Sequence, residues 1–273
     1  MTPLALEAPA KLNLSLRIVG RRDDGLHLLD SRLVLLELAD ELLLLPGCSG
    51  LRVSGEGAAD LPTDSTNLAW RGLLAGLGGE PEIACLALEK RIPAAAGLGG
   101  GSSDAAAAWR LGRASLGRTH RADDDELADL AFIGADVPFF AAELAAGRVT
   151  GVGERVEPST PLDAHIVLVH PPFGLSTAAV FAELRPDEWG RLENDLLAPA
   201  RRLRPKLDEV LLAVSGAGGH PQLSGSGPTV FSLADDVEQA AAIGAGIERA
   251  GFRATITRTR TRPAAIRAID EEE

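Results

Sequence analysis

The chain has 273 residues, enough for one large domain or two domains of ordinary size with a substantial buried core. Lysine and arginine number 27 against 39 aspartate and glutamate residues, and the net charge of −12 argues against nucleic acid or an anionic membrane as a partner. With 45% hydrophobic and 24% charged residues, the composition excludes wholesale disorder. The chain contains no tyrosine, so no tyrosine side chain contributes to whatever it binds.

The cysteines and the apolar segments indicate a soluble cytoplasmic protein. Cys48 and Cys85 are too few for a disulfide framework and lack metal-binding spacing, so we expect both to be buried thiols. Glu7 and Lys11 interrupt the N-terminal segment, which therefore lacks the apolar stretch of a signal peptide. The leucine-rich residues 33–45 contain three acidic residues and are too short to cross a membrane.

Apolar periodicity predicts the elements of the first half of the chain. A period of two indicates strands, and a spacing of three and four indicates amphipathic helices. In order, these patterns predict strands over residues 4–19, 33–38, 41–45 and 51–53, a helix over residues 67–77 and a strand over residues 83–88. Ala39 and Asp40 are expected to separate the second strand from the third, and Ser65 or Thr66 to cap the helix.

The second half is predicted in the same way. After a loop rich in glycine and serine, the predicted elements are helices over residues 103–111 and 123–131, a strand over 164–169, helical structure over 193–213, a glycine-rich turn into a strand over 222–232, a helix over 237–250 and a strand over 254–260. Residues 145–161 are rich in Gly, Pro and Thr, and we place a domain boundary between residues 156 and 157. Arg258, Arg260 and Arg262 are expected to form a solvated edge, and the acidic residues 270–273 to fray.

Residues 93–103, PAAAGLGGGSS, have the features of a phosphate-binding loop. Their glycines are expected to prevent regular structure before residue 103, where an alanine-rich helix begins. Backbone N–H groups in such a loop can converge on phosphate oxygens, and a helix N-terminus favours negative charge. A Walker A loop would need a Gly-Lys-Ser/Thr end, and a Rossmann loop would need a strand running directly into the first glycine, so neither fits. A purely structural turn is the alternative.

With this loop in view, the chain resembles the GHMP kinase superfamily of small-molecule kinases. Residues 93–103 are similar to its phosphate-binding motif, and residues 224–232, SGSGPTVFS, are similar to its third motif. Residues 8–16, APAKLNLSL, residues 24–27, DGLH, and residues 133–140, IGADVPFF, resemble the branch that phosphorylates 4-diphosphocytidyl-2-C-methyl-erythritol on the non-mevalonate route to isoprenoid precursors. The matching segments occur in the family's order and span most of the chain.

The resemblance implies a fold and a set of ligands. It implies an α+β fold of two domains, with a nucleotide-binding domain over residues 1–156 and a ferredoxin-like substrate domain over residues 157–273, whose last strand can return to the first domain. The phosphoryl donor would be ATP, with Mg²⁺ whose protein ligands the sequence does not identify, Ser102 or Ser103 being a reasonable hydroxyl contact. Small-molecule substrates are the only partners expected.

The resemblance also assigns site residues. Lys11 and Asp136 would be catalytic, the aspartate as base and the lysine as a stabilising charge. The nucleotide-binding residues would be Pro93, Ala94, Ala95, Ala96, Gly97, Leu98, Gly99, Gly100, Gly101, Ser102 and Ser103. The second substrate would contact Asn13, His27, Thr177 and Phe181. A helix-capping aspartate and a surface lysine are the structural alternatives for the catalytic pair.

Two departures from the family pattern bear on these assignments. Leu26 stands where the family usually has an aromatic residue that stacks on cytosine, and Ala95 and Ala96 stand where the motif is often Gly-Gly. Two other functions therefore stay open: a superfamily kinase for homoserine, mevalonate or a sugar, and a nucleotide-binding regulator without catalysis.

Overall fold

The computed structural model describes residues 2–79 and 84–269, so the prediction of a frayed tail over residues 270–273 lies outside the described residues. The strands are β1 (Leu4–Arg21), β2 (His27–Leu45), β3 (Gly50–Gly55), β4 (Cys85–Lys90), β5 (Ala146–Gly151), β6 (Arg155–Pro158), β7 (His165–His170), β8 (Gln222–Leu223), β9 (Val230–Ala234), β10 (Arg253–Arg258) and β11 (Arg267–Ala268). The α-helices are α1 (Leu68–Leu77), α2 (Gly100–Ser115), α3 (Asp124–Leu130), α4 (Val137–Ala141), α5 (Thr177–Ala182), α6 (Leu197–Leu203), α7 (Leu207–Gly216) and α8 (Val237–Arg249). Short 3₁₀ helices, η1 (Ala58–Asp60) and η2 (Pro186–Glu188), lie in two of the loops.

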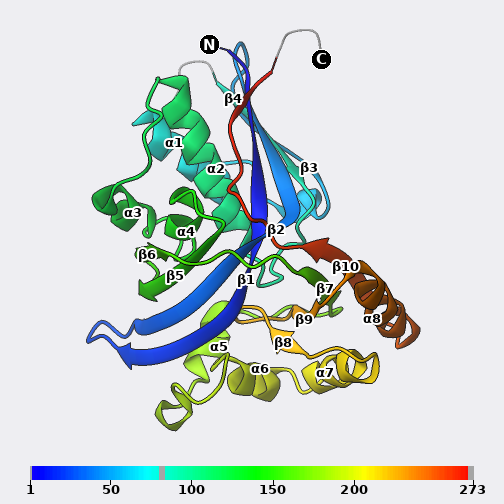
Figure 1. The fold of residues 1–273 in the computed structure, drawn as a ribbon. Helices are drawn as coiled ribbons and strands as arrows, with labels where there is room; N and C mark the ends of the chain where they lie inside the picture. The colour runs from blue at the N-terminus through cyan, green and yellow to red at the C-terminus, as the bar shows by residue number, and fades with distance from the viewer. Residues whose placement is uncertain (1, 80–83, 270–273) are drawn as a thin grey trace.

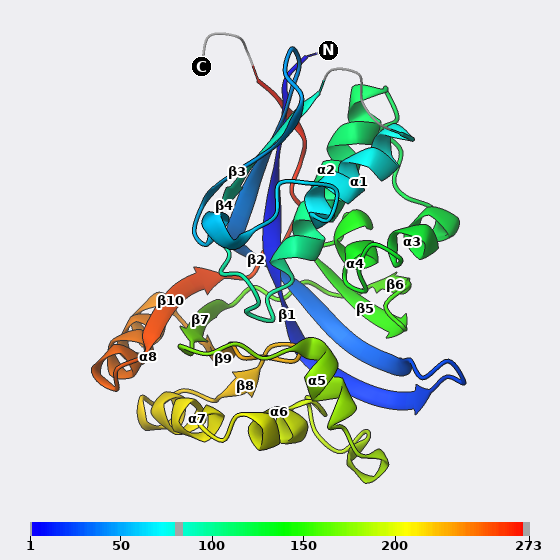
Figure 2. The same cartoon turned by 180° about the vertical axis from the view of Figure 1, so that it is seen from behind.

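The first sheet is built around the long antiparallel pair β1 and β2 (Figure 1). Strand order is β11-β1-β2-β4-β3, with β5 also paired to β2 and β6 paired to β5. Helices α1, α2 and α4 cover one face of this sheet in both views (Figures 1 and 2). Gly72 and Gly76 of α1 allow this helix to approach α2 closely, since a Cβ at either position would collide with the α2 backbone. The sheet and its helices therefore form one tightly packed layer pair.

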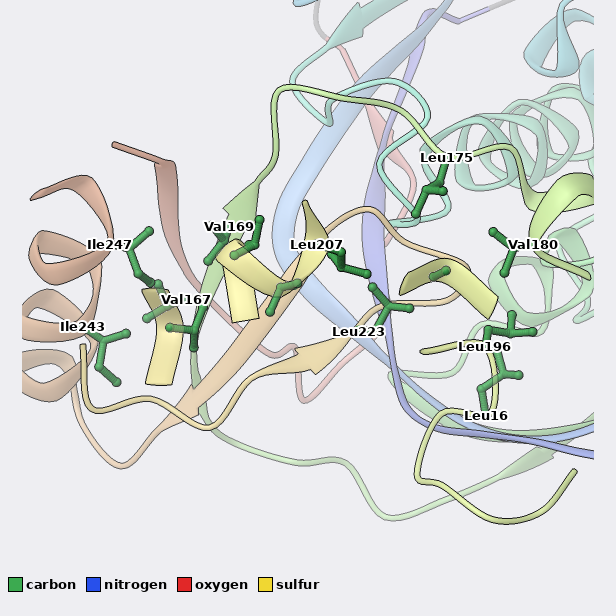
Figure 3. Packing of buried hydrophobic residues seen from close by; sticks show 14 of the residues in the cluster. Leu16, Val167, Val169, Leu175, Val180, Leu196, Leu207, Leu223, Ile243 and Ile247 are labelled. Carbon is green, nitrogen blue, oxygen red and sulfur yellow. The ribbon is translucent and has the colours of Figure 1, made fainter. Parts of the chain in front are cut away.

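The second sheet is a smaller antiparallel one in the order β10-β7-β9-β8. Helices α6, α7 and α8 pack on it around a core that includes Val167, Val210 and Ile247 (Figure 3). Leu16 and Ile18 of β1 also belong to this core. The long hairpin thus supplies apolar side chains to both parts of the molecule.

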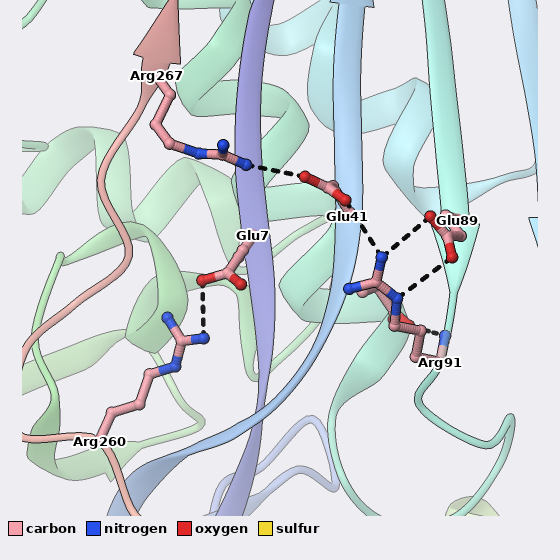
Figure 4. Close-up of polar contacts among 7 residues, drawn as sticks. Glu7, Glu41, Glu89, Arg91, Arg260 and Arg267 are labelled. Atoms are coloured by element: carbon pink, nitrogen blue, oxygen red, sulfur yellow. Dashed lines mark hydrogen bonds and ion pairs between the residues drawn. The ribbon is translucent and has the colours of Figure 1, made fainter. Parts of the chain in front are cut away.

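The end of the chain returns from the second sheet to the first. After β10, β11 pairs antiparallel with β1, with Leu4 opposite Ala268. Arg260 is 7% exposed, donates to the carbonyl oxygen of Leu36 at 2.9 Å and pairs with Glu7 at 2.8 Å (Figure 4). The prediction of a solvated edge is therefore wrong for Arg260, although Arg258 is exposed and pairs with Asp163.

Several predicted boundaries need correction. β2 runs without a break through Asp40, because this residue is fully buried and its carboxylate accepts hydrogen bonds from two backbone N–H groups. Helix α2 begins at Gly100 and not at residue 103, since Gly99 takes the N-cap position with φ 72°. The cap of α1 is Asn67, whose side chain accepts from the N–H of Ala69.

Residues 145–161, for which the sequence predicted a domain boundary and no strand, contain the strands β5 and β6. β5 pairs with β2 and β6 pairs with β5, so the backbone pairing outweighs the glycine and proline content of this segment. The strands up to β6 share the first sheet and β7 opens the second, while the domain boundary itself stays a prediction. Among the described residues, no helix has the length and apolarity needed to cross a membrane.

Candidate active site

A cavity of about 920 Å³ is lined by residues of both parts of the molecule. One wall is formed by β1 and β2, another by residues 93–102, and a third by α5 together with Gly225 and Ser226. Two of the three lysines in the sequence, Lys11 and Lys90, line this cavity. An acidic chain therefore places its scarce ammonium groups where an anionic ligand would bind.

The glycine-rich loop is held against the segment that precedes β9. The backbone N–H of Thr229 donates to the carbonyl oxygen of Ala96 at 3.3 Å, and the hydroxyl of Ser224 donates to the carbonyl oxygen of Gly97 at 2.9 Å. A Cβ on Gly97 would lie 2.6 Å from the carbonyl oxygen of Ser224, so only glycine fits there. The two glycine-rich segments are thus packed backbone to backbone.

Helix α2 begins at the cavity wall. Gly100, Gly101 and Ser102 form its first turn and line the cavity. The first N–H groups of a helix have no partner inside the helix and carry the positive end of its dipole. This 16-residue helix therefore presents N–H groups to the cavity in the arrangement that binds phosphate.

Lys11 and Asp136 meet in the cavity. Lys11 is 3% exposed, and its Nζ lies 3.6 Å from Oδ2 of Asp136, so the surface-lysine alternative is excluded. Asp136 is the N-cap residue of α4, but its side chain makes no capping hydrogen bond. The helix-capping role considered as the alternative for this aspartate is therefore not observed. The side chain of Asp136 is 38% exposed and lines the cavity, where the carboxylate can accept a proton from a bound hydroxyl.

Hydrogen bonds fix the orientation of Lys11. Its Nζ donates to Oδ1 of Asn13 at 2.6 Å and to the carbonyl oxygen of Gly97 at 3.0 Å. Asn13 in turn donates to the hydroxyl of Ser31 at 2.8 Å, and this hydroxyl donates to the carbonyl oxygen of Ser15 at 2.6 Å. The ammonium therefore joins the first strand, the glycine-rich loop and the predicted base.

A second buried ammonium lies behind the loop. Lys90 pairs with Asp40 and, at 2.7 Å, with Asp104 of α2. Burial raises the pKa of Asp104 to about 8, with Asp40 adding to this rise and Lys90 opposing it. Burial works against the charged form of Lys90, but Asp104 and Asp40 outweigh it and raise the pKa of this lysine. The sequence prediction missed this cluster, for which the one signal was a lone Asp40 within an apolar run.

The far end of the cavity is aromatic. The ring of His27 lies 5.4 Å from that of Phe181 and 5.8 Å from that of Trp189. Burial, with a smaller contribution from Arg21, lowers the pKa of His27. Leu26 is 51% exposed and lines the same end of the cavity.

Most of the predicted site residues come together here. The cavity lining includes Lys11, Asn13, His27, Asp136, Thr177, Phe181 and residues 93–102. Ser103 is the exception, because it is 1% exposed, faces the protein interior and is absent from the lining. Lining residues that the sequence prediction did not name include Ser31, Lys90, Asp104 and Ser226. The hydroxyl of Ser226 lies 2.8 Å from that of Thr177.

Family models and similar proteins point to the same kinase family. The models for the GHMP kinases N terminal domain and the GHMP kinases C terminal match residues 67–143 and 178–253. The chain is 41% identical to 4-diphosphocytidyl-2-C-methyl-D-erythritol kinase of Dinoroseobacter shibae, covering 88% of each chain. It is 38% identical to the protein of that name from Nocardia farcinica, covering 99% of this chain and 98% of the relative. The chain belongs to the 4-diphosphocytidyl-2-C-methyl-D-erythritol kinase family.

Solved structures support the same family. A crystal structure of 4-(cytidine 5'-diphospho)-2C-methyl-D-erythritol kinase superimposes with a TM-score of 0.74 at 34% identity, covering 93% of this chain and 98% of the other. A homoserine kinase from Cytophaga hutchinsonii, at 19% identity and a TM-score of 0.71 over 98% of each chain, shares the fold alone. The predicted α+β GHMP kinase fold is thereby confirmed, as is the prediction of a kinase with ATP as phosphoryl donor.

Proposed function

We propose that this kinase transfers the γ-phosphate of ATP to the 2-hydroxyl of 4-diphosphocytidyl-2-C-methyl-D-erythritol, a step toward isoprenoid precursors. The observation that carries the proposal is the pair of Lys11 and Asp136, 3.6 Å apart beside the first turn of α2. Nucleotide binding alone does not require a buried ammonium next to a carboxylate that makes no helix-capping hydrogen bond. The pair therefore favours a kinase over a silent regulator.

Asp136 acts as the base in this proposal. Its carboxylate accepts the proton of the substrate hydroxyl while that oxygen forms a bond to the γ-phosphorus. The bond between the γ-phosphorus and the bridging oxygen breaks, and its electron pair stays on the ADP oxygen. The proton stays on Asp136 until product leaves, so atoms and charges balance.

Lys11 and the glycine-rich loop stabilise the negative charge on the reacting oxygen and on the phosphates. The Lys11 ammonium, fixed by Asn13 and Gly97, stabilises the attacking oxygen and the transferred phosphoryl group. The N–H groups at the start of α2 bind the phosphates that remain on the nucleotide. Both groups are already positioned in the free protein, so little reorganisation is needed at the transition state.

Mg²⁺, when bound, would neutralise charge on the ATP phosphates. Among residues 2–79 and 84–269, no three His, Cys, Asp or Glu side chains group in a way that could hold a metal ion. The donor that fits is the hydroxyl of Ser102 on the cavity wall, a hard oxygen of the kind Mg²⁺ prefers, with phosphate and water oxygens completing the shell. The ion would thus enter with the nucleotide.

The cytidyl part of the second substrate binds at the aromatic end. A neutral imidazole can accept a hydrogen bond from the amino group of cytosine through one ring nitrogen, and the lowered pKa of His27 favours this neutral form at pH 7. Phe181 offers one stacking face, and Leu26 provides apolar contact where an aromatic residue is usual. Thr177 and Asn13 lie along the path toward Asp136. The cytoplasmic location and the absence of a protein partner stay predictions from the sequence.

The test is a direct comparison of acceptors. Purified protein is incubated with ATP and Mg²⁺ and with the cytidyl substrate, homoserine or mevalonate, and ADP release is measured. We expect turnover of the cytidyl compound alone. Turnover of homoserine or mevalonate without turnover of the cytidyl compound would refute the assignment.

A further inference from the structure

Trp189 contacts His27 from outside the cavity. The two ring centroids are 5.8 Å apart and the planes meet at 86°, an edge-to-face arrangement. Trp189 is half-buried against the core of the second sheet and is absent from the cavity lining, whereas His27 lines the cavity. The indole therefore stands behind the imidazole as seen from the bound substrate.

The chain after Trp189 is fixed by a buried carboxylate. Asp195 is 1% exposed and accepts hydrogen bonds from the N–H groups of Gly190, Arg191 and Leu192 at 2.6 to 3.0 Å. The same carboxylate accepts from the N–H of Ile18 in β1 at 2.8 Å. The loop that carries the indole is thus tied to the hairpin that carries His27.

The chain before Trp189 is fixed by a second acidic residue. Glu188 pairs with Arg202 of α6, and its carboxylate accepts from the N–H of Arg185 at 3.0 Å. The hydrogen bonds from Arg202 lower the pKa of Glu188 and keep it ionised at neutral pH. Trp189 is therefore held on both sides within a segment that otherwise lies on the surface.

The backbone of His27 is paired with Arg21 of β1 at the end of the hairpin. His27 is the first residue of β2, and it follows an exposed turn in which Arg22 pairs with Asp24. Leu26, its neighbour in that turn, is half exposed and offers no aromatic contact. In the described part of the chain, the rings of Phe181 and Trp189 pack against the imidazole, and Phe181 faces the cavity, where a base would displace or stack on it.

We propose that Trp189 is a positioning residue that fixes the imidazole of His27 for recognition of the cytidyl group. This inference rests on the proposed function for its role in substrate binding, but the contact itself can be tested without substrate. An edge-to-face aromatic pair contributes enough to change binding by about three- to tenfold. The effect should fall on the second substrate, because the ATP phosphates bind at the opposite end of the cavity.

The first experiment measures the pKa of His27 in the full-length protein by NMR titration, with His27→Gln to assign the resonance. In Trp189→Leu we expect this pKa to rise toward the usual value, because water reaches the imidazolium once the indole is removed. Trp189→Phe keeps an aromatic ring and should leave the pKa closer to that of the natural protein. Trp70→Leu, the same change on α1 away from the cavity, is the control and should have no effect. An unchanged pKa in Trp189→Leu would overturn the proposal.

The second experiment separates the two substrates. Trp189→Leu should raise KM for the cytidyl substrate about three- to tenfold and weaken binding of cytidine 5'-diphosphate in calorimetry, with KM for ATP unchanged. An equal rise in both KM values would mean general loosening and overturn the positioning role. If Trp189→Leu does not fold, Glu188→Gln loosens the same loop from its surface side and should shift the pKa and KM in the same direction. If the natural protein does not turn over the cytidyl substrate, the proposed function fails, while the NMR titration still decides the contact.

Discussion

Asp136 shows how a single residue departs from its expected structural use. An aspartate at an N-cap normally accepts a hydrogen bond from the first turn of the helix, which contributes about 1 kcal/mol to stability. Asp136 makes no such bond and turns its carboxylate toward Lys11 instead. The capping contribution is absent, and the geometry needed for proton transfer is present.

Asp136→Asn should lower kcat at least about a hundredfold, because the amide cannot accept the hydroxyl proton. Binding of ATP, measured by calorimetry, should change little, since in the proposed binding mode the nucleotide phosphates contact α2 and not Asp136. The melting temperature should also stay close to that of the natural protein, because no cap is lost. Retention of full activity would show that Asp136 is structural.

Ala95 occupies a backbone conformation that suits glycine. Its φ of 52° lies in the left-handed region, where a side chain costs roughly 1 kcal/mol, and it stands at one of the two positions where the family often has glycine. Ala96 is 7% exposed, packs in the core below the loop and has no such strain. The two neighbouring alanines should therefore respond differently to the same substitution.

Ala95→Gly should leave the free energy of unfolding unchanged or raise it by about 0.5 kcal/mol, since the relief of strain exceeds the added freedom of the unfolded chain. Ala96→Gly should lower it by about 1 kcal/mol through a lost buried methyl group and that same freedom. Urea denaturation of both variants measures the difference. Equal destabilisation by the two changes would contradict this account of the loop.

At the scale of elements, Asp40 links β2 to the phosphate-binding loop and to α2. One carboxylate oxygen accepts from the N–H groups of Arg91 and Ile92, where the loop begins, and the other pairs with Lys90. Lys90 continues the link to Asp104 in the first turns of α2. The loop is therefore braced from behind by charge as well as by its contact with the segment before β9.

This cluster has two carboxylates for one ammonium, and its stability depends on pH. The pKa of Asp104 is raised to about 8, so the folded state binds a proton that the unfolded state releases near pH 4. The contribution of Asp104 is fully present below about pH 4 and is lost as the pH rises through 8. Urea denaturation gives the free energy of unfolding of Asp104→Asn and of the natural protein at each pH. We expect the value for Asp104→Asn to rise relative to that of the natural protein from pH 5 to pH 8.5, by up to about 1.4 kcal/mol per pH unit. A difference that is constant with pH would show that Asp104 is ionised throughout.

The same elements show what the sequence could predict. The glycine-rich loop was predictable because a run of glycines before an alanine-rich helix has few structural explanations, whereas Lys11, Asp136 and His27 were assigned from the family resemblance and their roles stay predictions. Asp40 was misinterpreted from its local surroundings. A charge within an apolar run predicted a break between two strands, whereas the partner of this charge, Lys90, lies 50 residues away in the sequence and is brought near only by the tertiary structure. Trp189 carried no local signal, because its contact with His27 joins two separate segments of the chain.

At the scale of the whole molecule, the cavity exists because two sheets are held together. The β1 and β2 hairpin supplies Lys11 to the site, and Leu16 and Ile18 to the core of the second sheet. The chain then returns through residues 259–268 to the first sheet, where Arg267 pairs with Glu41 (Figure 4). Any change that weakens this return segment should affect stability before it affects chemistry.

Arg260 is the residue on which this prediction can be tested. Its guanidinium donates to the carbonyl oxygen of Leu36 and pairs with Glu7, and its N–H donates to the carbonyl oxygen of Leu35 at 2.8 Å. Arg260→Met removes the donor to the carbonyl oxygen of the buried Leu36 and the ion pairs with the exposed carboxylates of Glu7 and Glu37, so we expect a loss of about 1–3 kcal/mol in the free energy of unfolding, mainly from the carbonyl. Arg258→Met, which removes an exposed pair with Asp163, is the matched control and should cost less than about 0.5 kcal/mol. Chemical denaturation compares the two, and kcat of folded Arg260→Met should match that of the natural protein. Equal stability losses would mean that the buried contacts of Arg260 contribute no more to stability than the exposed ion pair of Arg258.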